Sequence, residues 1–121
     1  MNLLVIAIGG AAGSVARYLL STFLLRVTGA DFPVGTFVVN VIGCAIFGAI
    51  AGAATHRLSL SPEARLFLLV GVLGGFTTFS SYAFESFILI REGHLLAASA
   101  NIAGQVVIGL VAVSASYLVA L

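Results

Sequence analysis

Long apolar stretches separated by short polar segments run through the whole chain. A helix needs about 20 predominantly apolar residues to cross a bilayer. Three windows contain no Asp, Glu, Lys or Arg: Phe32 to His56, Leu66 to Phe84 and Gly93 to Leu121. A fourth window, Asn2 to Leu25, is interrupted only by Arg17. The pattern predicts four transmembrane helices, over about residues 3–27, 34–55, 62–90 and 95–119.

The third apolar window contains a segment that is a poor continuous helix. Residues 74–81 read GGFTTFSS, and glycine destabilises a helix interior while Ser and Thr offer the backbone competing hydrogen bonds. In lipid, broken backbone is tolerated only where protein buries it or where it lines a polar cavity. We therefore expect a break near residues 74–78 at mid-membrane, of the kind that exposes backbone carbonyl and N–H groups to an ion. This helix should begin at Ser61-Pro62, an N-cap residue followed by proline at the first helical position.

The composition allows little besides these helices. The 121 residues are 61% hydrophobic and 7% charged, whereas soluble domains carry about 25% charged residues. We expect one all-α integral membrane domain over residues 1–121, with the lipid bilayer as its surroundings and no enzymatic activity or nucleic-acid partner. The N-terminal apolar run lacks a basic start and is interpreted as a retained helix. Cys44 is the single cysteine, which rules out an intrachain disulfide and indicates a small packing residue.

The arginines give almost no orientation signal. With both termini on one side, Arg57 and Arg65 flank the second loop on that side, and Arg26 and Arg91 flank the loops on the other. Orientation normally follows an excess of Lys and Arg on cytoplasmic loops, and here the tally is two against two. The chain is therefore expected to insert in both orientations, which makes an antiparallel pair of identical subunits a natural assembly. The alternative is that one orientation wins for reasons that the loops do not reveal.

Polar side chains within the spans are few, and such groups are usually functional or hold helices together. Arg17 is costly inside a membrane helix. It either attracts anions, or supports the structure by pairing with Glu85 or capping the broken helix. Glu85 is expected to pair with an arginine or to lie at the membrane edge. The full set is Arg17, Asn40, Thr77, Thr78, Ser80, Ser81, Glu85, Asn101 and Gln105.

Two pairs at helical spacing are candidates for lining a pathway. Thr36 and Asn40 are four apart and share a face of the second helix, where they either form a polar pathway wall or make interhelical hydrogen bonds. Phe79 and Tyr82 are three apart on the resumed third helix. Such a pair is often packing, but aromatic rings have electropositive edges that can hold a small anion without trapping it.

At this point the chain resembles the Fluc (CrcB-type) fluoride channels over essentially its whole length. Three motifs carry the resemblance: Gly13-x-x-x-Arg17, Gly35-Thr36-x-x-x-Asn40-x-x-Gly43 and Gly71-x-x-Gly74-Gly75-Phe76-Thr77-Thr78-Phe79-Ser80-Ser81.

The resemblance implies an antiparallel, dual-topology homodimer with two parallel fluoride pathways. These would be lined by Asn40, Phe79 and Tyr82, the last at a position that is usually Phe, with Thr36 and Ser80 beside them. It also implies a structural Na⁺ at the dimer centre, bound by the backbone carbonyls of Gly74 and Thr77 from both subunits. The implied function is passive export of cytoplasmic fluoride across the bacterial inner membrane, which lowers fluoride toxicity.

The fourth helix departs from this family. Ile102 follows Asn101 where a Tyr is common, and Val106 and Leu110 occupy positions where hydroxyl groups are expected. Two other functions stay open at this stage. A dual-topology small multidrug transporter fits the size and the charge balance, but it needs a carboxylate in the first helix, which has none. A non-conducting assembly subunit would use the glycines for helix packing alone.

Overall fold

The computed structural model describes residues 1–29 and 31–121, and the regular elements in these ranges are helical. Four stretches are long and apolar enough to cross a membrane: Asn2–Thr28, Val34–His56, Pro62–Arg91 and Leu95–Ala120. This confirms the expectation of an all-α, multi-pass membrane protein with four spans. The elements in chain order are α1 (Asn2–Thr28), α2 (Val34–His56), α3 (Pro62–Arg65), η1 (Leu66–Val72), α4 (Leu73–Phe76), α5 (Phe79–Arg91) and α6 (Leu95–Ala120).

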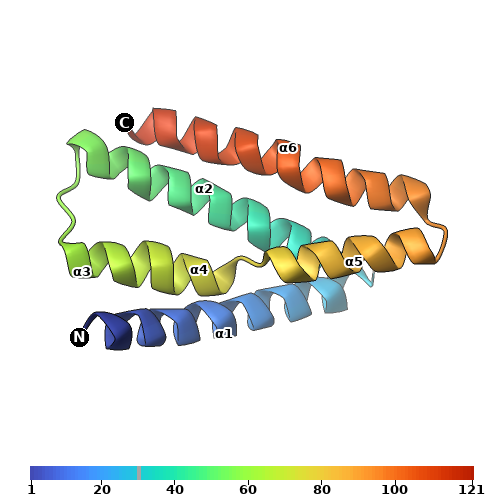
Figure 1. Ribbon diagram of the computed structural model, residues 1–121. Helices are drawn as coiled ribbons and strands as arrows, with labels where there is room; N and C mark the ends of the chain where they lie inside the picture. Colours follow the sequence, from blue (N-terminus) through green and yellow to red (C-terminus); the bar gives the residue numbers. More distant parts are fainter. Residues whose placement is uncertain (30) are drawn as a thin grey trace.

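The spans run alternately in opposite directions (Figure 1). Both termini and the segment between α2 and α3 lie at one end of the molecule, while α5 turns into α6 at the other end. The third span begins as the sequence predicts, because the Ser61 hydroxyl accepts a hydrogen bond from the Ala64 N–H at 3.1 Å and Pro62 takes the first helical position.

The third span is not one continuous helix. Its π-helical segment η1 leads into α4, which ends at Phe76, and α5 begins at Phe79. Between them, Thr77 (φ −88°, ψ 156°) and Thr78 (φ −149°, ψ 120°) are extended. Two residues of extended backbone therefore separate a helix C-terminus from a helix N-terminus inside this span.

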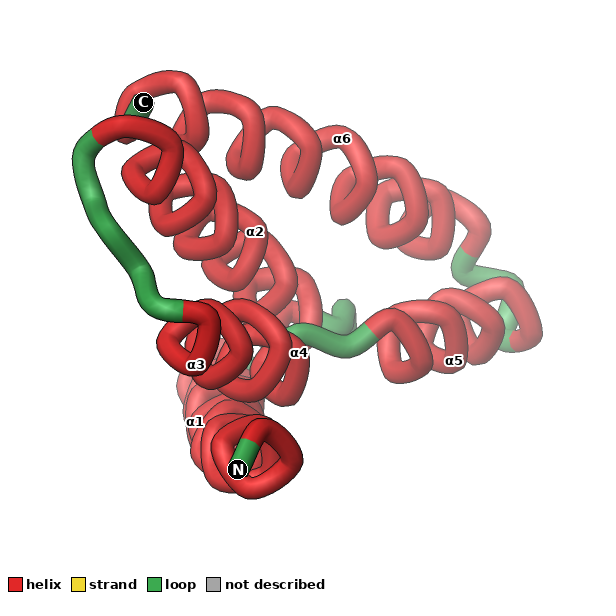
Figure 2. Tube along the Cα trace, turned by 60° about the vertical axis from the view of Figure 1, so that its left-hand side comes forward, coloured by secondary structure: helices red, strands yellow, loops and turns green. Residues whose placement is uncertain are grey.

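The interruption lets the two halves of the third span pack on different neighbours. η1 and α4 lie against α1, whereas α5 lies against α6, and α2 packs most extensively on α6 (Figure 2). The third span thus crosses the molecule at Thr77 and Thr78.

Glycines allow the close approach on which this packing depends. A Cβ atom added to Gly75 would lie 2.6 Å from the Gly10 carbonyl oxygen, and one added to Gly43 would collide with the Thr77 methyl group. In lipid, helices associate through close van der Waals contact of small residues more than through apolar burial. In keeping with this, the buried apolar core is small: Val39, Leu73, Phe76, Leu89 and Ala98.

Candidate functional site

The Asn40 side chain of α2 forms hydrogen bonds with both backbone polar groups of Thr78, at the interruption of the third span. Its Oδ1 accepts from the Thr78 N–H at 2.9 Å, and its Nδ2 donates to the Thr78 carbonyl at 3.1 Å. The extended backbone at Thr78 cannot complete a helical ladder, so a side chain from another helix takes the place of that ladder. The amide of Asn40 thereby fixes where the interruption occurs.

A chain of hydrogen bonds continues from Asn40 into the contact between α5 and α6. Asn40 Nδ2 also donates to Gln105 Oε1 at 2.7 Å, and Gln105 Nε2 donates to Asn101 Oδ1 at 2.9 Å. Asn101 Nδ2 then donates to Ser86 Oγ at 2.9 Å, and that hydroxyl donates to the Tyr82 carbonyl at 2.7 Å. Asn101, Gln105 and Ser86 are all buried, so this network links three spans in the interior.

Arg17 contacts the other side of the interruption. Its Nε donates to the Gly75 carbonyl oxygen at 3.1 Å, near the C-terminus of α4. A cation at the end of a helix satisfies a carbonyl that has lost its helical partner and complements the helix dipole. Arg17 was expected to attract anions, to pair with Glu85 or to cap the broken helix. In the structure it caps the broken helix.

Glu85 lies beside Thr36 instead of an arginine. The Thr36 hydroxyl donates to Glu85 Oε1 at 2.8 Å, and Oε2 is buried without a hydrogen-bond partner among the described residues. Glu85 was expected to pair with an arginine or to lie at the membrane edge, and its hydrogen-bond partner is instead the neutral hydroxyl of Thr36 on α2. Thr36 and Asn40 both reach the third span from α2, four residues apart.

The two aromatic rings at the start of α5 form a tilted pair. The ring centroids of Phe79 and Tyr82 are 5.5 Å apart at an interplanar angle of 51°. The Tyr82 hydroxyl donates to the Ile102 carbonyl of α6 at 2.9 Å, whereas the Phe79 side chain is 77% exposed in the single chain. Ser80 is exposed beside Phe79, with its hydroxyl 3.3 Å from that of Thr78.

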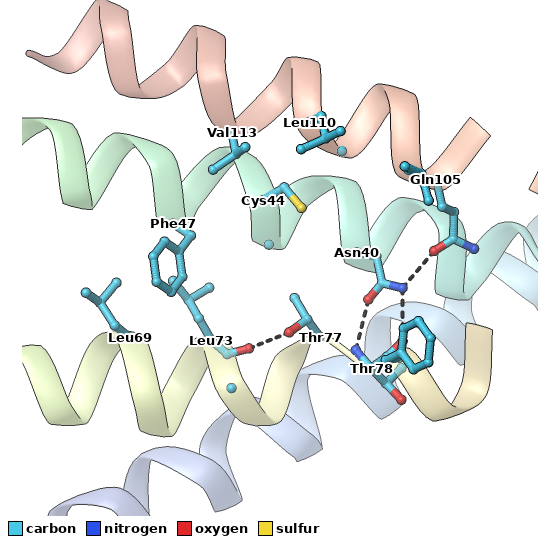
Figure 3. A pocket seen from close by; sticks show the side chains of 15 residues that line it. Asn40, Cys44, Phe47, Leu69, Leu73, Thr77, Thr78, Gln105, Leu110 and Val113 are labelled. Carbon is cyan, nitrogen blue, oxygen red and sulfur yellow. Dashed lines mark hydrogen bonds between the residues drawn. The ribbon is translucent and has the colours of Figure 1, made fainter. Parts of the chain in front are cut away.

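Asn40, Thr78, Phe79 and Gln105 border an open, mostly apolar crevice of about 500 Å³ between α2, α4 and α6 (Figure 3). Asn40, Thr78 and Gln105 gather at one end of the crevice in the close-up, and Phe47 and Leu69 lie toward the other end. A smaller notch of about 170 Å³ is lined by Phe79, Tyr82, Gln105 and Val106. Gln105 lines both the crevice and the notch.

The carbonyl groups expected to bind sodium lie at the interruption. In a continuous helix the Thr78 N–H would donate to the carbonyl of Gly74, four residues earlier. Here the Thr78 N–H donates to Asn40 Oδ1, so the Gly74 carbonyl does not receive that hydrogen bond. Gly74 is exposed in the single chain. Among residues 1–29 and 31–121, no group of three or more His, Cys, Asp or Glu could hold a metal ion.

Sequence reasoning left Gln105 out of the site, although it noted the residue as a polar group within a span. Asn101 and Gln105 are four residues apart, which places them on one face of α6. This spacing could have identified both as candidate site residues. Val106 and Leu110, which depart from the expected hydroxyl residues, do line the crevice. The fourth span thus contributes both a buried amide and an apolar wall.

Residues 4–117 match the family model described as CrcB-like protein, Camphor Resistance (CrcB). The chain is 51% identical over 106 residues to the fluoride-specific ion channel FluC of Maridesulfovibrio salexigens, covering 88% of this chain and 84% of the relative. It is 49% identical over 113 residues to the fluoride-specific ion channel FluC of Solibacter usitatus, covering 93% of each.

Four spans, one of them interrupted beside the amide of Asn40, define a multi-pass membrane protein. The match over nearly the whole chain shows that this protein belongs to the CrcB family.

Proposed function

We propose that this chain forms a fluoride-selective ion channel that exports cytoplasmic fluoride passively down its electrochemical gradient. The observation that carries the proposal is the 51% identity over 88% of the chain to a protein named as a fluoride-specific ion channel. No energy-coupling chemistry is needed for passive export, because the inside-negative membrane potential already drives an anion outward. The small multidrug transporter is not favoured, since the family model that matches residues 4–117 is CrcB and the relatives reported above are named fluoride channels.

The geometry at the start of α5 supports an anion pathway. A helix N-terminus carries N–H groups without helical partners and a positive end of the helix dipole, both of which favour an anion. Phe79, Tyr82 and Ser80 lie at this N-terminus, with Asn40 and Thr36 on the facing helix. Ring edges bind an anion weakly enough that it can leave, which conduction requires. We assign these five residues to the fluoride pathway and Arg17 to support of the break.

The exposure of polar groups at the interruption supports a dimer. Gly74 and Ser80 are exposed in the single chain, next to extended backbone at Thr77 and Thr78. Within a bilayer such backbone must be covered by protein or must face water, because lipid offers it no hydrogen bonds. A second copy in the opposite orientation would cover this face and place the interruption at mid-membrane, with one pathway on each side.

A structural Na⁺ between two such copies fits the available ligands. Gly74 and Thr77 would supply carbonyl oxygens from each subunit, and Na⁺ prefers hard oxygen ligands of this kind. The ion would neutralise carbonyl groups that the break leaves without N–H partners. Exchange of sodium for a bulky organic cation should then reduce fluoride flux, and full flux after exhaustive exchange would contradict this assignment.

We assign the channel to the bacterial inner membrane. Growth of bacteria in the presence of fluoride tests the proposed export. A bacterial strain that lacks its own fluoride exporter should regain growth in fluoride when it expresses this chain. A Phe79→Ile variant present in the membrane at equal amount should protect less, because it lacks the ring edge. No protection by the unaltered protein would contradict the proposed export and favour a non-conducting assembly subunit. Protection against cationic drugs in place of fluoride would favour the transporter.

A further inference from the structure

We propose that the N–H group offered to the permeating anion belongs to Gln105, and that Asn40, which lines the same pathway, acts there by positioning the break and donates no hydrogen bond to the anion. This inference rests on the proposed fluoride pathway and names a donor within it. It follows from counting the hydrogen bonds of each amide in the network.

The amide of Asn40 has no N–H to spare. A carboxamide nitrogen carries two N–H donors. In Asn40 one donor is used by the Thr78 carbonyl and the other by Gln105 Oε1, while Oδ1 accepts from the Thr78 N–H. An anion could gain a donor from Asn40 only by displacing one of these contacts.

The orientation of every amide in the network follows from a single backbone group. The Thr78 N–H can only donate, so the atom of Asn40 that receives it must be oxygen. This choice places Nδ2 of Asn40 toward Gln105, which in turn must present Oε1. Nε2 of Gln105 is then the atom that meets Asn101 Oδ1, without any ambiguity between amide oxygen and nitrogen.

Gln105 therefore keeps one N–H for another acceptor. Its Nε2 donates once, to Asn101, and its second N–H has no acceptor among the described residues. The side chain is only 8% exposed, so bulk water does not surround this donor. In Figure 3 the oxygen of Gln105 is directed to Asn40, and its nitrogen is turned away from Asn40. A buried donor without a partner is costly, which indicates a ligand that uses it.

The surroundings of this donor suit a small anion. Gln105 lines the notch of about 170 Å³ together with Phe79, Tyr82 and Val106. One neutral N–H and two aromatic rings attract an anion without the strong trap that a buried cation would create. Val106 supplies no hydroxyl at a place where the fourth helix was expected to carry one. In this chain, the polar contribution of the fourth span to the pathway therefore comes from Gln105.

The sequence makes a direct test possible, because Gln105 is its only glutamine. Selective ¹⁵N labelling of the glutamine side chain in the full-length protein, reconstituted in lipid nanodiscs, should give a single NH₂ group with two proton resonances. Sodium fluoride is titrated in, with sodium chloride at equal concentration as the control. We expect fluoride to shift one of the two protons strongly and the Asn101-bonded proton little, while chloride shifts neither.

A pair of variants measures the consequence for flux. Gln105→Met keeps the length of the side chain and removes both donors, and it should lower fluoride efflux from liposomes about tenfold or more, as expected for loss of a hydrogen bond to an ion. Ser116→Ala is the control on the same helix, since its hydroxyl bonds locally to the Val113 carbonyl at 3.3 Å. It should retain normal efflux.

The outcomes separate this inference from the proposed function. Fluoride efflux without any fluoride response of the Gln105 protons would overturn this inference alone, as would an equal response to chloride. No fluoride efflux from the unaltered protein would overturn the proposed function and this inference together. If Gln105→Met does not fold, the resonance experiment on the unaltered protein still decides the question.

Discussion

Asn40 binds both the N–H and the carbonyl of Thr78, at 2.9 and 3.1 Å. The side chain of one helix thus takes over the backbone hydrogen bonds at the point where another helix is interrupted. This contact fixes the position of the break, and with it the N-terminus of α5 and the rings of Phe79 and Tyr82.

Replacing Asn40 should loosen the break. Asn40→Leu leaves the Thr78 N–H and Gln105 Oε1 without partners, and we expect a loss of about 1–3 kcal/mol in the free energy of unfolding, the usual cost of such groups. Thermal unfolding of the purified protein in detergent measures this. Thr55→Ala on the same helix is the control, because its hydroxyl only bonds to the Ala51 carbonyl one turn earlier. Equal stability of the two variants would contradict the role of Asn40 as a positioning residue.

The packing of α4 on α1 depends on Gly75. A Cβ at this position would lie 2.6 Å from the Gly10 carbonyl oxygen, so Gly75→Ala should force the two helices apart and cost about 1–3 kcal/mol, as is typical of overpacking. Gly10→Ala is the matched control, since its added Cβ would lie 3.9 Å from the Gly71 carbonyl oxygen. The unfolding midpoint in detergent should fall for Gly75→Ala only. A similar fall for Gly10→Ala would show that the close approach of Gly75 to Gly10 does not determine the stability.

The Tyr82 hydroxyl connects α5 to α6. Tyr82→Phe removes the 2.9 Å hydrogen bond to the Ile102 carbonyl, and we expect stability to fall by about 0.5–1.5 kcal/mol while fluoride efflux continues, because the ring remains. Tyr18→Phe, at a residue 66% exposed on α1, is the control for loss of a phenol. Abolished efflux in Tyr82→Phe would mean that the hydroxyl itself contacts the ion.

The electropositive edge of Phe79 should matter for flux more than for stability. Phe79→Ile is expected to reduce fluoride efflux by roughly tenfold, in line with the energy of aromatic edge contacts. Phe84→Ile is a matched control, since Phe84 lies on the same helix and is 63% exposed, against 77% for Phe79. Both variants should remain assembled in gel filtration. Unchanged efflux in an intact Phe79→Ile protein would contradict a role for the ring edge.

Much of the architecture could be predicted because apolar length alone determines a membrane helix. The four spans follow from three windows free of charge and a fourth that only Arg17 interrupts, and the start of the third span follows from Ser61 and Pro62. The composition of residues 74–81 also identified the segment in which the backbone departs from helix, at Thr77 and Thr78.

The partners of the polar side chains could not be predicted in the same way. Whether Arg17 meets Glu85 or a carbonyl depends on how closely α1 approaches α4, which the glycines permit but do not specify. The bond between Thr36 and Glu85 joins residues 49 apart in the chain, and that between Asn40 and Gln105 joins residues 65 apart. Periodicity assigns each residue to a face of its own helix, and only tertiary packing decides which faces meet.

The most direct test of the central claim is fluoride efflux from liposomes that contain the purified protein, with chloride as the control ion in matched liposomes. The account predicts rapid efflux of fluoride, at a rate far above that of protein-free liposomes, and no efflux of chloride above that background. Equal efflux of both ions would contradict selectivity at the site formed by Phe79, Tyr82 and Gln105. No efflux of either ion from folded, membrane-inserted protein would contradict the channel function itself.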